Sequence, residues 1–256
     1  MTVRIEKRPG AERGNRTPEK IQSLSSGAIG TVTDAVKDAA GGAIRAVKPR
    51  LRGWIHAFTA PLALAACIVL TVLAPGPALT WACAAYLACS LFLFANSGVY
   101  HISYGHWPRR VSAVLQRVDH ANIYLLIAGT YTPLSVALLD RGMTLLVLGI
   151  VWGGALAGII TSLAWRSAPR WLTTLFYILL GWVAIWFLPQ FWMTGGPAIV
   201  WLLVSGGVVY TVGGAVYARR WPDPDPRWFG FHEIFHTCTV AAWACQCTAC
   251  YLAVLG

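Results

Sequence analysis

Charged side chains are scarce in this chain: Asp, Glu, Lys and Arg make up 12% of its 256 residues, whereas hydrophobic residues make up 57%. Soluble domains average about 25% charged residues. A core of this size cannot hide so much apolar surface from water, so part of that surface is expected to face lipid. The shortage of charge therefore excludes a water-soluble globular protein and predicts an integral membrane protein.

A cleavable signal peptide is not expected either, because no apolar run followed by an A-x-A site comes after the basic start of the chain. Residues 1–53 hold eleven of the twenty Lys and Arg residues and are rich in Gly, Ser and Ala. They are predicted to form a disordered cytoplasmic tail. A basic tail beside a membrane is typical of an orientation signal that contacts anionic lipid, so the net charge of +10 does not indicate a nucleic-acid partner.

Long apolar segments fill the rest of the chain, residues 54–256. Each has about 20 residues or more, enough at 1.5 Å per residue to cross roughly 30 Å of hydrocarbon. This pattern predicts an all-α domain, a seven-transmembrane helix bundle. The seven segments are 54–73, 78–104, 119–139, 143–165, 171–191, 198–218 and 229–255.

The distribution of positive charge predicts the orientation of these spans. Nineteen of the twenty Lys and Arg residues lie in the tail or in the connections after the second, fourth and sixth segments, and only Arg141 lies on the other side. Positive residues favour the cytoplasmic side of a membrane. The N-terminus is therefore expected in the cytoplasm and the C-terminus outside, in the cell (plasma) membrane.

Ionisable residues inside the predicted spans are very few, and such residues are functional candidates by default. With the predicted orientation, all of the main candidates lie near the cytoplasmic ends of the second, third and seventh spans. Three distant parts of the sequence therefore converge on one leaflet. The candidates are Ser97, His101, Asp119, His232 and His236.

The spacing of the histidines favours a metal site. His232 and His236 are four residues apart, so both imidazoles project from one face of a helix. Three neutral histidines suit Zn²⁺ with an open fourth position for water, and a carboxylate such as Asp119 could accept a proton from that water. The alternatives are hydrogen-bonded core histidines, and for Asp119 a helix N-cap or an ion pair with Arg117 or Arg110. Ser97 could instead be a helix-packing residue.

The motifs NSGVYH, RVDHANIYLLIAGTYTP and GFHEIFH, in that order, resemble the haemolysin III branch of the progestin and adipoQ receptor family. The resemblance covers residues 54–256 and implies a seven-helix bundle with zinc bound near the cytoplasmic face. It implies His101, His232 and His236 as the ligands, with Ser97 and Asp119 completing the site, the latter through water. Relatives are associated with hydrolysis of amide-linked lipids, with haemolysis and with membrane-lipid homeostasis.

A zinc-dependent hydrolase of amide- or ester-linked membrane lipid is thus the leading hypothesis, with the lipid as partner. One alternative is a non-enzymatic regulator of membrane lipid in which zinc is structural, and another is a pore-forming haemolysin. A minor alternative is an intramembrane metalloprotease, because His232 to His236 also matches H-E-x-x-H with Glu233 as general base. His106 and His120 are expected at the membrane interface. His56 has no assigned role, since many members of the family have His-Gly where this chain has His56-Ala57.

Overall fold

The computed structural model describes residues 51–165, 169–225 and 227–256. The predicted tail lies outside the described residues except for Leu51–Gly53. The elements are helices α2 Trp54–Leu73, α3 Gly76–Ile102, α4 Arg109–Leu138, α5 Arg141–Ala164, α6 Arg170–Gly181, the 3₁₀ helix η1 Trp182–Phe187, α7 Leu188–Arg219 and α8 Phe231–Leu255.

The described part of the chain is helical, with one isolated bridge between Asp225 and Phe229 as its only β-type pairing. A helix satisfies its backbone hydrogen bonds internally, which a segment in lipid requires. Within the described ranges, six helical stretches are long and apolar enough to cross a membrane. The prediction of an all-α membrane protein is therefore confirmed.

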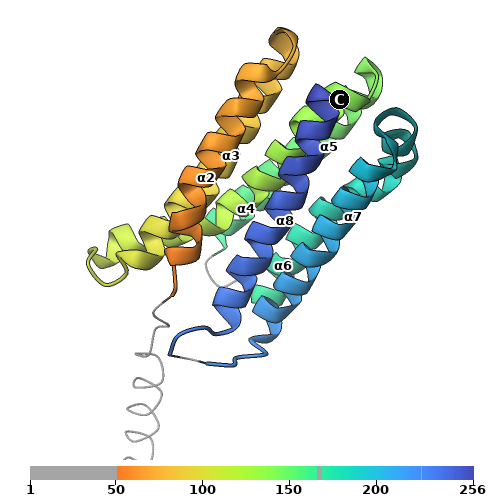
Figure 1. Ribbon diagram of the computed structural model, residues 1–256. Helices are drawn as coiled ribbons and strands as arrows, with labels where there is room; N and C mark the ends of the chain where they lie inside the picture. Colours follow the sequence, from red (N-terminus) through yellow and green to blue (C-terminus); the bar gives the residue numbers. More distant parts are fainter. Residues whose placement is uncertain (1–50, 166–168, 226) are drawn as a thin grey trace, which may run out of the picture. The chain divides into compact units, whose positions relative to one another are not determined.

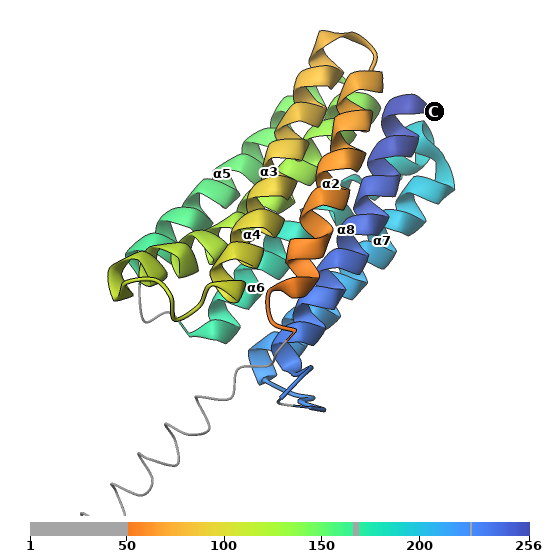
Figure 2. The same ribbon diagram turned by 60° about the vertical axis from the view of Figure 1, so that its left-hand side comes forward.

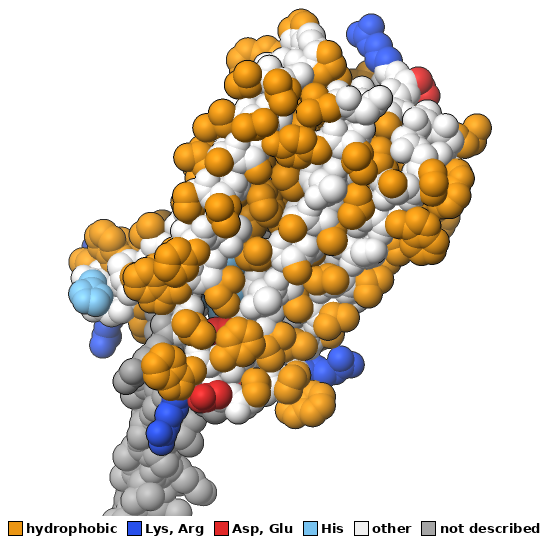
Figure 3. Space-filling view, viewed as in Figure 1, with side chains coloured by type: hydrophobic (Ala, Val, Ile, Leu, Met, Phe, Trp, Pro, Cys, Tyr) orange, Lys and Arg blue, Asp and Glu red, His pale blue; other side chains and the backbone are white. Residues whose placement is uncertain are grey.

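The outer surface of the bundle is apolar. Many large hydrophobic side chains are exposed, among them Val72, Trp81, Trp186 and Met193. Figure 3 shows hydrophobic side chains over most of the visible face, with charged side chains mostly near the ends. This surface would be unstable in water and is stable against lipid tails.

The fifth of the six stretches, Arg170–Arg219, contains two of the predicted segments, 171–191 and 198–218. Its helical geometry breaks at Gly196, where φ is 79°. Trp182, before the break, donates a hydrogen bond from Nε1 to Thr211 Oγ1 at 2.9 Å, and Thr174 lies against Gly214. The two arms therefore run antiparallel and pack side by side, as α6 and α7 do in Figure 1.

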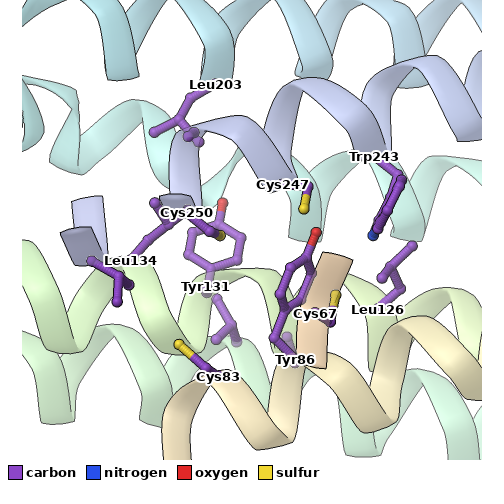
Figure 4. Close-up of a cluster of buried hydrophobic side chains, with 14 of the residues drawn as sticks. Cys67, Cys83, Tyr86, Leu126, Tyr131, Leu134, Leu203, Trp243, Cys247 and Cys250 are labelled. Atoms are coloured by element: carbon purple, nitrogen blue, oxygen red, sulfur yellow. The ribbon is translucent and has the colours of Figure 1, made fainter. Parts of the chain in front are cut away.

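The last helix occupies a central position in the bundle. Helix α8 packs against α2, α4 and α7 (Figure 2). Its core face contributes Trp243, Cys247 and Cys250, and in Figure 4 the Cys247 sulfur lies beside the hydroxyl group of Tyr86 of α3. Trp243 Nε1 donates to Ser90 Oγ at 3.1 Å, so its polar atom is satisfied inside the core. The seven cysteines are all free.

Helix α4 begins at Arg109, ten residues before the predicted apolar segment at 119. Residues 109–118 contain three arginines among apolar residues, which interrupts the apolar run, but none of them breaks a helix. Asp119 consequently lies almost three turns inside α4. The alternative in which Asp119 is a helix N-cap is wrong, because Pro108 occupies that position.

Candidate metal centre

Three helix segments meet at one end of the bundle, the end where α3 runs into α4 and α7 runs into α8 (Figure 1). His101 is the penultimate residue of α3, and His232 and His236 lie in the first two turns of α8. Asp119 is on the inner part of α4. The predicted convergence of these residues is therefore found in the structure.

The three histidines form a group suited to hold a metal ion. One ring nitrogen from each of His101, His232 and His236 lies within 4.8 Å of the other two. The closest pair is His101 Nε2 and His232 Nε2, at 3.3 Å. His101 and His236 are buried and His232 is half-buried, so the ring nitrogens converge in a space that the bundle shields.

The carboxylate expected beside the histidines is present. Asp119 Oδ2 lies 3.5 Å from His101 Nε2, and the Asp119 side chain is 12% exposed. Ser97, one turn before His101 on α3, is 2% exposed, and its side chain approaches the same carboxylate. The structure thus brings all five predicted site residues together.

Glu233, the acid of the H-E-x-x-H pattern, is directed away from this group. Its side chain is fully buried, and Oε1 accepts a hydrogen bond from Arg52 Nε at 2.8 Å. Oε2 accepts a hydrogen bond from the backbone nitrogen of Gly230 at 2.9 Å, which completes the start of α8. Glu233 is absent from the lining of the cavity described below. With both oxygens engaged, it serves the fold and is not available as a general base.

The chain that leads into α2 runs across the site. Gly53 has a φ of 90°, and a Cβ at this position would lie 2.7 Å from His101 Cβ. Only glycine fits this close approach, and only glycine adopts this φ without strain. The backbone nitrogen of Leu51 also contacts the Trp228 carbonyl oxygen at 3.4 Å. Residues 51–53 therefore hold the end of α3 and the start of α8 together.

Helix α2 approaches α3 closely beside the site. A Cβ on Gly98 would lie 3.0 Å from the Ala57 Cα. The methyl group of Ala57 is thus accommodated by the glycine opposite it. The preceding residue, His56, stacks on His236 with ring centroids 3.8 Å apart and planes 5° apart. The departure from His-Gly therefore leaves His56 in contact with the site.

A cavity of about 330 Å³ opens beside the histidines. Its lining includes residues for which the sequence analysis proposed no site role. Tyr217 lies 3.5 Å from His120 Nε2, and the Arg170 guanidinium lies 5.5 Å from the centre of the Tyr217 ring. A single aromatic or basic residue near a helix end has no sequence spacing that would indicate a site. Its place in the site is therefore seen only in the folded structure. The polar lining residues are His56, Ser97, Gln116, Arg117, Asp119, His120, Ser162, Arg170, Thr173, Thr174, Tyr177, Tyr217, His232, His236 and Thr239.

His120 was expected at the membrane interface, and the structure instead has it half-buried on this cavity. It directly follows Asp119 on α4, so the earlier start of that helix moves both residues away from the helix end. His106 is exposed, in the connection between α3 and α4.

A second cavity, of about 110 Å³, adjoins the first and is lined mostly by apolar residues of α3, α4, α6, η1, α7 and α8. The two cavities share Leu93, Ile123, Tyr177, Phe235 and Thr239 as lining residues. The polar cavity beside the histidines therefore shares part of its wall with the apolar cavity.

Comparison with known proteins agrees with these features. A family model described as "Haemolysin-III related" matches residues 44–247. The chain is 32% identical over 142 residues to a protein of Bacillus subtilis (strain 168) named "Hemolysin-3 homolog", which covers 55% of this chain and 65% of that protein. It is 36% identical over 110 residues to "Hemolysin-3" of Bacillus cereus, covering 42% of this chain and 49% of that protein. The chain thus spans about half to two thirds of the length of these relatives.

Proposed function

Because the chain belongs to the haemolysin-III-related family, we propose that it is a zinc-dependent hydrolase of an amide- or ester-linked membrane lipid. The metal ligands are His101, His232 and His236. The observation that carries the proposal is a polar cavity, lined by His232, His236 and Asp119, whose walls continue into an apolar cavity. That combination matches a lipid, in which a polar linkage joins an apolar chain.

The donor set fits zinc in chemistry, and one pair of its nitrogens already has the spacing that zinc requires, while all three lie within 4.8 Å of one another. Neutral imidazole nitrogens are common zinc ligands, and three protein ligands leave a position open for reaction. Two nitrogens at about 2.0–2.1 Å from a tetrahedral zinc ion are about 3.3 Å apart. The separation between His101 Nε2 and His232 Nε2 is 3.3 Å. When bound, zinc supplies Lewis-acid chemistry, polarising a carbonyl group and making water at the site more acidic.

Asp119 is the residue best suited to move a proton. Its Oδ2 lies on the cavity and within 3.5 Å of a ligand nitrogen, so it is near any water or carbonyl group that enters beside the histidines. It can accept a proton at Oδ2 and return it to the leaving amine or alcohol. The neighbouring Ser97 hydroxyl is close enough to the carboxylate to help orient it.

The apolar cavity would receive the acyl chain. Burial of apolar surface stabilises binding by about 0.8 kcal/mol per methylene group. A chain seated there would hold its carbonyl group close to the shared lining residues Tyr177, Phe235 and Thr239, at the boundary of the two cavities. The acyl chain thereby positions the scissile bond beside the histidines and Asp119.

The topology proposed here has seven crossings, with the N-terminus in the cytoplasm and the C-terminus outside, in the cell membrane. The antiparallel arms on either side of Gly196 support two crossings within the stretch Arg170–Arg219. The charges support the orientation, because among the described arginines only Arg141 stands at the end away from the site. Those at the site end are Arg52, Arg109, Arg110, Arg117, Arg170, Arg219, Arg220 and Arg227. A reporter fused to the C-terminus should be active only outside the cell.

Lipid turnover by the purified protein tests the proposal. The protein in nanodiscs is loaded with zinc, its metal content is measured, and a panel of ceramides and lysophospholipids is assayed for released fatty acid. Asp119→Asn should keep the zinc and lose about 10²- to 10⁴-fold in turnover, as expected for loss of a general base. Asp140→Asn is the matched control, because Asp140 caps α5 at the opposite end of the bundle.

Two other outcomes would replace the proposal. Stoichiometric zinc with no turnover of any lipid in the panel would favour a non-enzymatic regulator whose zinc ties α3 to α8. Leakage of dye from liposomes, at a rate independent of Asp119, would favour the cytolysin that the names of the Bacillus relatives suggest.

A further inference from the structure

His56 is a buried histidine to which neither the sequence nor the proposed chemistry assigns a role. It is the third residue of α2, it is 3% exposed, and it lines the cavity that contains Asp119, His232 and His236. It is therefore inside the site without belonging to the ligand group.

Neither ring nitrogen of His56 has a hydrogen-bond partner among the described residues. Buried polar atoms are normally paired, and an unpaired one costs about 1–3 kcal/mol. Both nitrogens are buried, and the residue that carries them lines the cavity. A polar group that enters the cavity is therefore a candidate partner for them.

Two aromatic rings pack against the His56 imidazole. One face stacks on His236, with centroids 3.8 Å apart and planes 5° apart, and the Phe94 ring meets His56 edge-on at 5.2 Å and 81°. These two contacts fix the plane of the imidazole. The edge of the ring carries both unpaired nitrogens, and these are the atoms that could bind a ligand.

The stacking also excludes His56 as a ligand of the ion that His236 would bind. A metal ion lies in the plane of each imidazole that coordinates it. Two parallel rings 3.8 Å apart have separate planes, so an ion in the plane of His236 lies well outside that of His56.

We propose that His56 binds the polar group of the lipid through a hydrogen bond from its ring edge, while its face supports His236. A neutral imidazole has one donor and one acceptor nitrogen, which match the carbonyl, amide or hydroxyl groups of an acyl linkage. The identity of the ligand rests on the proposed function, whereas the need for a polar partner rests on the unpaired nitrogens.

Two variants separate the edge of the ring from its face. His56→Phe keeps an aromatic ring for stacking on His236 and removes both nitrogens. His56→Gln keeps a donor and an acceptor and removes the ring. Both are made in the Asp119→Asn background, so that lipid binding is measured without turnover. His106→Phe, at an exposed position, is the control.

Binding of palmitoyl ceramide and of palmitate in nanodiscs, and the visible absorption of bound Co²⁺, are the two measurements. We expect His56→Phe to leave the cobalt spectrum unchanged and to weaken lipid binding by roughly 5- to 100-fold. We expect His56→Gln to bind lipid better than His56→Phe and to alter the cobalt spectrum.

If His56→Phe binds lipid as tightly as the parent, the proposal is wrong. It is also wrong if both variants lose lipid binding and cobalt binding to the same extent, because that result indicates that His56 acts only by packing. If the zinc-loaded protein binds lipid in a His56-dependent manner but hydrolyses none, the proposed hydrolase fails and this inference stands. If it binds none of the probes, both fail.

Discussion

The Glu233 carboxylate is held by Arg52, whose Nε donates to Oε1 at 2.8 Å across 181 residues of sequence. The pair joins the segment before α2 to the first turn of the helix that carries two of the three candidate ligands. Because Glu233 also accepts a hydrogen bond from Gly230, the start of α8 and the segment before α2 share one buried carboxylate.

Arg52→Ala should therefore destabilise the bundle. Removing one partner of a buried ion pair typically costs about 3–5 kcal/mol, and we expect the lower end because the Arg52 side chain is 22% exposed. Thermal unfolding in detergent measures the change, and Arg141→Ala is the control. In the Arg52→Ala protein, Glu233→Gln removes the unpaired buried charge and should recover part of the lost stability. An unaltered melting temperature in Arg52→Ala would contradict this account.

Glu233→Gln alone tests the metalloprotease alternative. Glutamine can still accept the hydrogen bond from Gly230, so lipid turnover should stay within about tenfold of wild type. A general base, by contrast, contributes about 10²- to 10⁴-fold. If turnover falls by that much while the Glu233→Gln protein remains stable, Glu233 takes part in catalysis.

Replacing any one of the three histidines should abolish stoichiometric zinc binding. Loss of a partner that supports a ligand typically costs about 10–100-fold in affinity, so loss of a ligand itself should cost at least about 100-fold. Metal content of purified His101→Ala, His232→Ala and His236→Ala, measured by mass spectrometry, checks this. His106→Ala should retain full zinc, since its side chain is exposed in a loop. Full zinc in any of the three variants would remove that residue from the site.

The contact between α2 and α3 makes a reciprocal prediction. Gly98→Ala would bring a methyl group within 3.0 Å of the Ala57 backbone, which we expect to cost about 1–3 kcal/mol of stability. Ala57→Gly should restore only part of it in the double variant, because it removes the Ala57 Cβ at 3.1 Å and leaves the Ala57 Cα and backbone nitrogen in place. A double-mutant cycle on unfolding free energies measures the coupling. If the two substitutions change the free energy of unfolding additively, α2 and α3 can move apart freely at this point.

Acyl-chain preference should depend on the apolar cavity. Gly207 lines it, and a Cβ there would meet Trp182 at an ordinary distance of 3.6 Å, so a larger side chain can project into the space. Gly207→Leu should shift preference to shorter chains, by roughly fourfold for each methylene excluded. Zinc content should not change. Gly149→Leu, where nothing lies within 4 Å, is the control. Unchanged chain preference would argue that the acyl chain lies elsewhere.

The sequence predicted the helical membrane fold and the five main site residues because both depend on strong local signals. Long apolar runs can only be helical in lipid, and polar residues in them are too costly to be incidental. Segment ends were less accurate. The start of α4 has three arginines among its apolar residues and so lacks a continuous apolar run. The apolar stretch before Gly196 gave no indication that part of it forms a 3₁₀ helix.

The supporting residues could not have been predicted in the same way. Arg52 and Glu233 are paired across most of the chain, and His56 is a single histidine with no repeat spacing. Their roles depend on which helices become neighbours, and that is decided by close contacts such as Ala57 on Gly98. A local sequence pattern does not indicate which distant residues will become neighbours in the fold.

The path of Leu51–Gly53 has a practical consequence for dissecting this protein. A chain shortened to begin at Trp54 would retain every predicted span, yet it would lack the arginine that neutralises Glu233 and the glycine that lies against His101. Deletion series from the N-terminus should thus show an abrupt loss of metal uptake between positions 51 and 54. The smallest autonomous unit begins just ahead of the first helix.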